Sequence, residues 1–265
     1  MTLATFGTTN KAMKTLTILF TLLSVQTYSQ KTMETTHLNV GDSTIIVNHH
    51  YIEKDSSILY LNIHEDEQTS IEAIQEFNKT KPVNFIFLQH NKTRRIHFNI
   101  KEKNYSFDPN RIYTRKGRKN TIAPKQFLKY KPRVISKFIA SHIINIIKKY
   151  DVIVTLHNNT DVNYSIKSYQ AGEDESENTA EVYINETWDP DDFIYTTEKK
   201  YFDHLKTEGV NVILQKQSGY INDGSLSVYC GKAHIKYINI EAQKGHFNEQ
   251  VKLIFIIDEM LQKLK

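Results

Sequence analysis

The residue types most able to do chemistry are two histidines and a glutamate that follow predicted strands. His64 and Glu67 lie three residues apart on a loop directly after the apolar run 58–61. His157 ends the apolar and β-branched run 152–156, a pattern typical of a buried parallel strand. Catalytic zinc sites commonly combine imidazole and carboxylate ligands and leave one position open for water. We therefore predict that His64, Glu67 and His157 bind one Zn²⁺ ion.

Glu241 adds an acid-base group to this set. It follows the apolar run 237–240, and so it also stands at the end of a predicted strand. Zinc held by neutral imidazoles and one carboxylate lowers the pKa of a bound water toward ~7. A glutamate beside that water can accept its proton and pass it to a leaving nitrogen. Glu241 is therefore a further candidate site residue, and the set contains the residue types that metal-assisted hydrolysis uses.

The elements that must position these residues alternate between strands and helices. Apolar runs predict strands at 44–47, 57–63, 84–88, 95–100, 152–157, 211–215, 226–229 and 235–240. Helices are predicted at 70–78, 132–150, 198–207 and 248–264, and apolar spacings of three and four are clearest in 132–150. Thr69 and Glu72 form a predicted capping box for the first helix. The polar stretch 158–197 is expected to be mostly loop with short strands. The pattern predicts a single α/β domain with a mixed, mostly parallel sheet and helices on both faces.

The expected fold explains how distant residues could meet. In open α/β sheets the ligand crevice lies outside the carboxyl ends of the strands. His64, His157 and Glu241 all stand at such ends in the predicted element order. We expect these three side chains to converge at one edge of the sheet.

Composition limits the functional classes. The chain has 265 residues, 39% hydrophobic and 24% charged, which suits one globular domain with a substantial core. Residues 1–30 contain two lysines, a short apolar stretch and then polar residues, which predicts a secretory signal and an exported, periplasmic or secreted domain at 31–265. No later stretch is long enough for a transmembrane segment. Removal of the predicted signal takes away two lysines, so the formal charge falls from +4 to +2, too small to indicate nucleic-acid binding.

A family resemblance rests on four motifs that occur in order. They are His64-x-x-Glu67, Asn110-Arg111, His157 and Glu241. Together they resemble the zinc carboxypeptidase superfamily, including its aspartoacylase and succinylglutamate desuccinylase branch. The resemblance implies that the His-x-x-Glu pair and the later histidine bind zinc, that the Asn-Arg pair binds a substrate carboxylate, and that the late glutamate is the general base. A planar guanidinium suits that recognition, because it can donate two parallel hydrogen bonds to a carboxylate.

Several assignments have alternatives at this point. A lone His-x-x-Glu is usually a solvated turn, and a lone strand-end histidine is usually a satisfied buried group. Residues 108–111 could simply be a turn whose backbone Asp and Pro set, although the binding role of Arg111 is favoured. Peptidases of the superfamily often have a further oxyanion-binding arginine, for which Arg94 and Arg95 lie in the expected region, and a mobile tyrosine, for which Tyr220 is in a similar place. The basic cluster 115–119 could attract anionic substrates or simply be solvated. Iron, manganese and cobalt also occupy sites of this ligand type.

Three functions are compatible with the pattern. The first is an exported zinc hydrolase that cleaves an amide bond in a small peptide with a free carboxylate, for which cell-wall peptides are one candidate class. The second is a deacylase of N-acyl amino acids that uses the same zinc, base and arginine. The third is a non-catalytic binding protein on the same fold, which the presence of Glu241 disfavours because a binding site needs no general base.

Overall fold

A computed structural model describes residues 31–52, 57–127, 130–160 and 164–264. The predicted secretory signal, residues 1–30, lies outside the described residues. None of the described helices is both long enough and apolar enough to cross a membrane.

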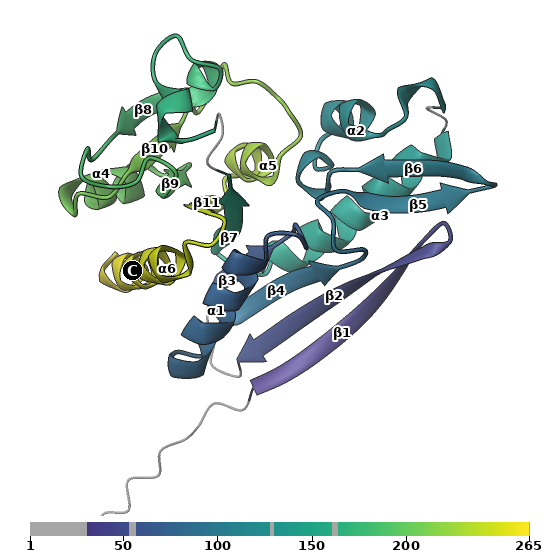
Figure 1. Ribbon diagram of the computed structural model, residues 1–265, viewed down its shortest axis with the longest axis horizontal. Helices are drawn as coiled ribbons and strands as arrows, with labels where there is room; N and C mark the ends of the chain where they lie inside the picture. The colour runs from purple at the N-terminus through teal and green to yellow at the C-terminus, as the bar shows by residue number, and fades with distance from the viewer. Residues whose placement is uncertain (1–30, 53–56, 128–129, 161–163, 265) are drawn as a thin grey trace, which may run out of the picture.

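The core of the molecule is a nine-stranded mixed sheet with the strand order β1-β2-β4-β3-β7-β11-β9-β10-β8 (Figure 1). Its strands are β1 (Lys31–Val40), β2 (Ser43–Ile52), β3 (Ile58–Asn62), β4 (Asn84–Gln89), β7 (Val152–Asn159), β8 (Thr179–Tyr183), β9 (Phe193–Thr196), β10 (Val212–Gln215) and β11 (Lys236–Gln243). A separate hairpin pairs β5 (Ile96–Ile100) with β6 (Lys103–Phe107). The predicted mixed α/β architecture is confirmed.

Parallel pairing is concentrated at the centre of the sheet. Strands β4, β3, β7 and β11 are parallel to one another. The outer neighbours of this group, β2 beside β4 and β9 beside β11, pair with it in antiparallel orientation. The central strands are buried along nearly their whole length, in agreement with their continuous apolar runs. Their carboxyl ends therefore point to one edge, where the predicted site residues lie.

Helices cover both faces of this sheet. On one face pack α1 (Gln68–Thr80), α4 (Lys199–Thr207) and α6 (Phe247–Lys263), whose apolar sides form one core with β3, β7 and β11. On the other face pack α3 (Tyr130–Ile147), α5 (Leu226–Ala233) and the β5–β6 hairpin. A short helix, α2 (Arg115–Thr121), follows the 3-10 turn 109–111 and lies next to α3 (Figure 1).

The segment 226–229, predicted to be a strand, is the first half of helix α5. Its composition favours a strand, and the alternate residues Leu226, Val228 and Cys230 are buried. The helix is fixed at both ends by local bonds. The Ser225 side chain accepts the Val228 N–H at the start, and His234 adopts the left-handed conformation at the end. Ser225 is therefore a helix cap.

The capping box predicted for the first helix is also wrong. Helix α1 begins one residue earlier than Thr69, with Glu67 as its N-cap residue and no side-chain cap bond. Thr69 instead accepts the backbone N–H of Gly245, which follows β11. The remaining predicted helices and strands match observed elements within a few residues, whereas β1, β6 and α2 were not predicted.

Candidate metal centre

The central parallel strands bring the predicted site residues to one edge of the sheet. His157 and Glu241 are direct register partners on β7 and β11. His64 lies two residues after the end of β3, on the other side of β7. The sheet thus supplies Glu241 from β11, His157 from β7 and His64 from the loop after β3, and these three strands are adjacent and parallel.

The loop between β3 and α1 holds His64 and Glu67 in one tight turn. The Glu67 N–H donates to the His64 carbonyl across 3.2 Å. Ser70, in the first turn of α1, donates its hydroxyl to the Glu67 carbonyl at 2.8 Å and accepts the Asn62 amide at 2.7 Å. Because Asn62 is the last residue of β3, these bonds fix the loop to both the strand and the helix.

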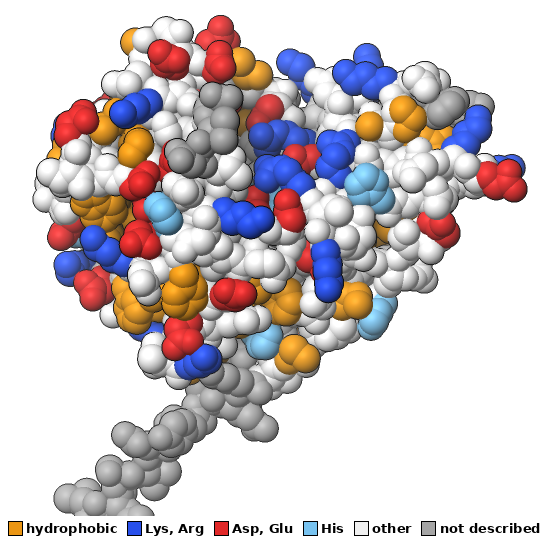
Figure 2. All heavy atoms as spheres, in the orientation of Figure 1, with side chains coloured by type: hydrophobic (Ala, Val, Ile, Leu, Met, Phe, Trp, Pro, Cys, Tyr) orange, Lys and Arg blue, Asp and Glu red, His pale blue; other side chains and the backbone are white. Residues whose placement is uncertain are grey.

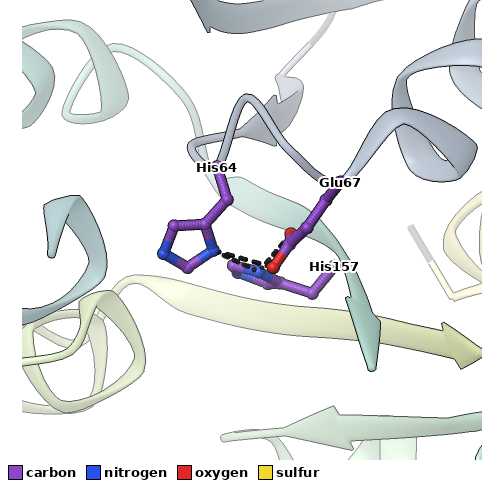
Figure 3. A group of neighbouring side chains, drawn as sticks. All are labelled: His64, Glu67 and His157. Carbon is purple, nitrogen blue, oxygen red and sulfur yellow. Dashed lines mark hydrogen bonds and ion pairs between the residues drawn. The ribbon is translucent and has the colours of Figure 1, made fainter. Parts of the chain in front are cut away.

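His64, Glu67 and His157 converge on a single point (Figure 3). Nδ1 of His64 lies 2.9 Å from Glu67 Oε1, and Nδ1 of His157 lies 2.9 Å from Glu67 Oε2. The two Nδ1 atoms are 3.2 Å apart. All three residues are at most 4% exposed. Three buried ligand atoms that face one another are stabilised by positive charge between them, and a divalent metal ion could supply it.

Asp108 holds the outer side of His64. Its Oδ1 lies 2.9 Å from His64 Nε2 and also accepts the Asn110 N–H at 2.7 Å. A carboxylate that accepts from the outer nitrogen of an imidazole leaves the inner nitrogen free to bind a metal. Sequence reasoning treated residues 108–111 only as a turn with a carboxylate-binding pair, and missed this role. The sequence shows an acidic residue close before the Asn-Arg pair. It does not show that this residue contacts His64, because the two are 44 residues apart.

Charge at the site is set by this cluster of carboxylates and imidazoles. Burial lowers the pKa of His64, but the carboxylates of Glu67 and Asp108 outweigh burial and raise it to about 9. Burial raises the pKa of Glu67, but His157 and His64 outweigh it, so the net shift is well below the ordinary value. The site therefore favours ionised carboxylates together with positive charge on or between the histidines. A bound metal ion can provide this charge in place of the protons on the imidazoles.

The types of the three side chains are ones that bind zinc in proteins. Two imidazoles and one carboxylate form the ligand set found in zinc hydrolases, and the carboxylate behind His64 is the usual second partner of such an imidazole. His64, Glu67 and His157 are therefore the residues of the described chain that could hold the metal.

A cavity of about 540 Å³ opens over this centre, a size suited to a small-molecule substrate. Among the predicted site residues, Glu67, His157, Asn110, Arg111 and Glu241 line it. In Figure 2, Lys and Arg side chains gather in the middle of the visible face, between the part of the molecule with α4 and β10 and the part with α2, β5 and β6.

Glu241 faces the cavity from β11. It is 7% exposed, and its Oε1 accepts the Asn239 amide at 2.9 Å. Burial is the main cause that raises the pKa of Glu241 above the ordinary value for a glutamate. A carboxylate with a raised pKa beside a metal centre is suited to take up and release a proton near neutral pH.

The Asn-Arg pair lies across the cavity on the 3-10 turn 109–111. The Asn110 side-chain oxygen accepts the Leu226 N–H at 3.0 Å, and Arg111 Nε lies 3.4 Å from Asp223 Oδ2. Arg111 is partly exposed and lines the cavity. The pair is thus held by the segment before α5, and the guanidinium remains open to a ligand.

Two glycines allow this part of the site to form. A Cβ on Gly117 would lie 2.4 Å from the Arg111 carbonyl oxygen, and a Cβ on Gly224 would lie 2.6 Å from the same atom. Gly224 also has a φ of +89°, which favours glycine. Helix α2 and the turn before α5 can therefore close on the backbone of Arg111 only because both positions lack a side chain.

Of the two candidate oxyanion arginines, only Arg94 reaches the cavity. Its Nη1 lies 2.7 Å from Glu67 Oε1. The loop that carries it is anchored to the metal-binding loop, because Glu65 accepts the N–H groups of His90 and Lys92 at 2.6 and 2.8 Å. Arg95 points elsewhere and donates to the side chain and carbonyl of Ser106.

Several tyrosines line the cavity. Tyr164 and Tyr169 share a hydrogen bond between their hydroxyl groups, and the Tyr195 hydroxyl donates to Gln215 at 2.9 Å. Tyr220 also lines the cavity. These side chains give the substrate region an aromatic wall with polar tips.

Comparisons with known proteins give likeness at the level of structure only. No family model matches the sequence, and no curated protein matches it. A solved structure from Shewanella frigidimarina, provisionally described as a succinylglutamate desuccinylase/aspartoacylase, has 9% identity and a TM-score of 0.42 over 84% of this chain and 69% of its own. A provisionally described metallopeptidase from Shewanella denitrificans has 14% identity and a TM-score of 0.39 over 83% and 79%.

An aspartoacylase family protein from Mesorhizobium loti has 12% identity and a TM-score of 0.40 over 84% of this chain and 65% of its own. All three identities lie below 15%, and all three TM-scores lie below 0.5. Because the identities and scores are low, the functional inference below rests on the residues of the site.

Proposed function

We propose that this protein is an exported zinc-dependent hydrolase that cleaves an amide bond in a small peptide with a free carboxylate. The observation that carries the proposal is the convergence of His64, Glu67 and His157 next to a cavity that Glu241 and Arg111 line. A metal ligand set, a buried base and an exposed guanidinium are the parts that such a reaction needs.

His64, Glu67 and His157 would hold the zinc ion. When bound, zinc lowers the pKa of water and polarises the carbonyl oxygen of the substrate. Asp108 supports this by keeping a proton on the outer nitrogen of His64, so the inner nitrogen remains available as a ligand.

Glu241 acts as the proton carrier. Its carboxylate accepts a proton from the attacking water and delivers it to the leaving nitrogen, which makes the amine a better leaving group. The Asn239 amide holds one carboxylate oxygen and leaves the other for this exchange. A raised pKa helps the first half of the transfer, because a more basic carboxylate takes up the proton of water more readily.

Arg111 selects the substrate. Its guanidinium can bind the substrate carboxylate through two parallel hydrogen bonds. The Asn110 side-chain oxygen already accepts a backbone N–H, which leaves its amide N–H₂ as the group that can donate to a ligand. Arg94 lies beside Glu67 and can donate to the carbonyl oxygen on which negative charge develops.

The deacylase of N-acyl amino acids is the second candidate, since it would use the same residues on a smaller substrate. A cavity of about 540 Å³ accommodates either class. The length of the accepted substrate separates them, because a peptidase accepts additional residues on the acyl side of the scissile bond.

Metal content and activity together test the proposal. Purified parent protein, His157→Ala and Glu67→Gln are dialysed and analysed for bound metals, with Glu241→Gln as the metal-retaining control. We expect about one zinc per chain in the parent and in the control, and a large loss in the two ligand variants. Peptides and N-acyl amino acids with free and amidated carboxyl ends are then screened, and only the free acids should be cleaved.

A parent protein that holds no metal and cannot be loaded with any would overturn the hydrolase proposal. Metal binding without turnover of either substrate class, together with tight binding of such ligands, would favour the non-catalytic binding protein.

A further inference from the structure

The distribution of charge along the chain is uneven. Residues 109–150 contain 12 lysines and arginines and no aspartate or glutamate. The rest of the chain holds 22 basic and 30 acidic residues, so this one block is strongly positive and the remainder is negative. The block contains α2 and α3, which lie next to each other (Figure 1).

The basic side chains of this block are available to a ligand. Arg115, Lys116 and Lys119 on α2 are exposed, as are Lys131, Arg133 and Lys137 on α3. Within the described residues, Arg111 is the member of the block for which a carboxylate lies within ion-pair distance. Figure 2 shows Lys and Arg side chains over α2, with hydrophobic side chains beside them. The surface therefore presents uncompensated positive charge.

Helix α3 also exposes an apolar stripe. Tyr130, Val134 and Phe138 are spaced by four residues and are 81%, 43% and 51% exposed. At 1.5 Å per residue, the stripe extends along the helix for about 12 Å. The buried side of the same helix is formed by other residues, including Ile139 and Ile143, which pack into the core. The exposed stripe is therefore not required to hold α3 on the sheet.

Charge and apolar exposure occur together in a definite arrangement. On a helical projection at about 100° per residue, the three apolar residues occupy one sector of about 80°. Lys131 borders that sector on one side, and Arg133 and Lys137 border it on the other. Aromatic and aliphatic side chains flanked by Lys and Arg are the pattern of helices that lie at an anionic membrane surface.

We propose that α2 and the N-terminal half of α3 form a docking surface for a bilayer that contains anionic phospholipids. The apolar stripe enters the boundary between headgroups and acyl chains, and the flanking lysines and arginines contact the phosphate groups. Charge complementarity argues for a membrane, and the exposed Tyr130 and Phe138 argue against a purely ionic partner, which would not require apolar groups. This surface is separate from the cavity, so the inference does not depend on the proposed hydrolase activity.

Vesicle co-sedimentation tests the proposal with a chain that starts at Lys31. This chain contains every described helix and strand and lacks the apolar stretch 16–23, which would bind bilayers on its own. Vesicles of phosphatidylcholine alone are compared with vesicles of equal parts phosphatidylcholine and phosphatidylglycerol. We expect binding only to the anionic vesicles, with weaker binding as salt is raised.

Two sets of variants separate the charged and apolar contributions. Neutralising Arg115, Lys116 and Lys119 to Gln should weaken binding roughly 100-fold, since each basic residue near the surface contributes about a factor of five. The Tyr130→Ser and Phe138→Ser double variant should weaken it roughly 30-fold. Circular dichroism and melting curves check that both fold as the parent does.

Matched controls lie elsewhere on the molecule. A triple change of Lys206, Lys252 and Lys263 to Gln removes the same charge from α4 and α6, on the opposite face of the sheet, and should leave binding unchanged. Ile221→Ser with Phe255→Ser removes two other exposed apolar groups and should also have no effect.

Equal binding to both vesicle types, or equal losses in the controls, would overturn the proposal. If the charge variants lose binding but Tyr130→Ser with Phe138→Ser does not, and if soluble polyphosphate competes fully, the surface binds a polyanion and the membrane proposal is wrong.

Discussion

Replacing Asp108 by Asn should weaken zinc binding without disturbing the fold around the site. Asp108 Oδ1 accepts from both His64 Nε2 and the Asn110 N–H, at 2.9 and 2.7 Å. An asparagine oxygen can keep both bonds, so the substitution removes mainly the negative charge behind the imidazole. Outer partners of metal-binding histidines typically contribute 10- to 100-fold in affinity, or about 1.4 to 2.7 kcal/mol.

Competition with a zinc-binding dye measures the dissociation constants of the parent and the variant. Asp223→Asn is the matched control, because it makes the same chemical change beside Arg111 in the cavity wall, and Asp223 forms no hydrogen bond with His64. We expect the control to keep the parent affinity for zinc and to change only the KM of the substrate.

Unchanged zinc affinity in Asp108→Asn would refute the role assigned to Asp108. An equal loss in Asp223→Asn would show that the effect comes from the overall charge of the cavity, and the argument from the His64 hydrogen bond would fail.

Three further predictions concern the base, the substrate carboxylate and pH. Glu241→Gln should lower kcat by about 10²- to 10⁴-fold while elemental analysis finds the same zinc content. Arg111→Met should raise KM by roughly 10- to 100-fold for substrates with a free carboxylate and leave binding of an amidated analogue unchanged, as measured by steady-state kinetics and calorimetry. His49, which lies beside Tyr150, has a pKa lowered to about 4, chiefly by burial. Neutral His49 should therefore favour the folded state fully above pH 6.5. This stabilisation should be lost as pH falls toward 4, because the histidine of the unfolded chain takes up a proton at a higher pH than the buried one does. After allowance for solvent screening the loss is about 1 to 2 kcal/mol, and urea denaturation of the parent and His49→Gln at pH 7 and 4.5 should show a smaller decline in the variant.

Local patterns in the sequence predicted most of the sheet. The runs 85–88 and 152–156 consist of apolar or β-branched residues without interruption, which few structures other than a buried strand can accommodate. Amphipathic spacing likewise identified α3 and α6. Strand β1 was missed because it is an edge strand with many polar residues, so that pairing with β2 determines its conformation more than its own burial does.

Helix α5 shows where local patterns fail. Leu226 to Cys230 contain residues that favour strands and alternate in burial, and the Ser225 cap and the packing around Gly224 decide for a helix. Composition is a weak guide when a segment is short and its ends are fixed by contacts with distant residues.

The sequence by itself determined the chemical types at the site and their order, because His64, Glu67, His157 and Glu241 each follow a recognisable apolar run. Tertiary structure alone decided how they meet. Parallel pairing of β3, β7 and β11 places His157 opposite Glu241 and next to His64. Contacts of the loops bring Asp108 behind His64 and place Arg94, not Arg95, at the cavity beside Glu67. Such contacts join residues tens of positions apart, and no local periodicity specifies them, because periodicity reports which face of an element is buried and not which element it faces.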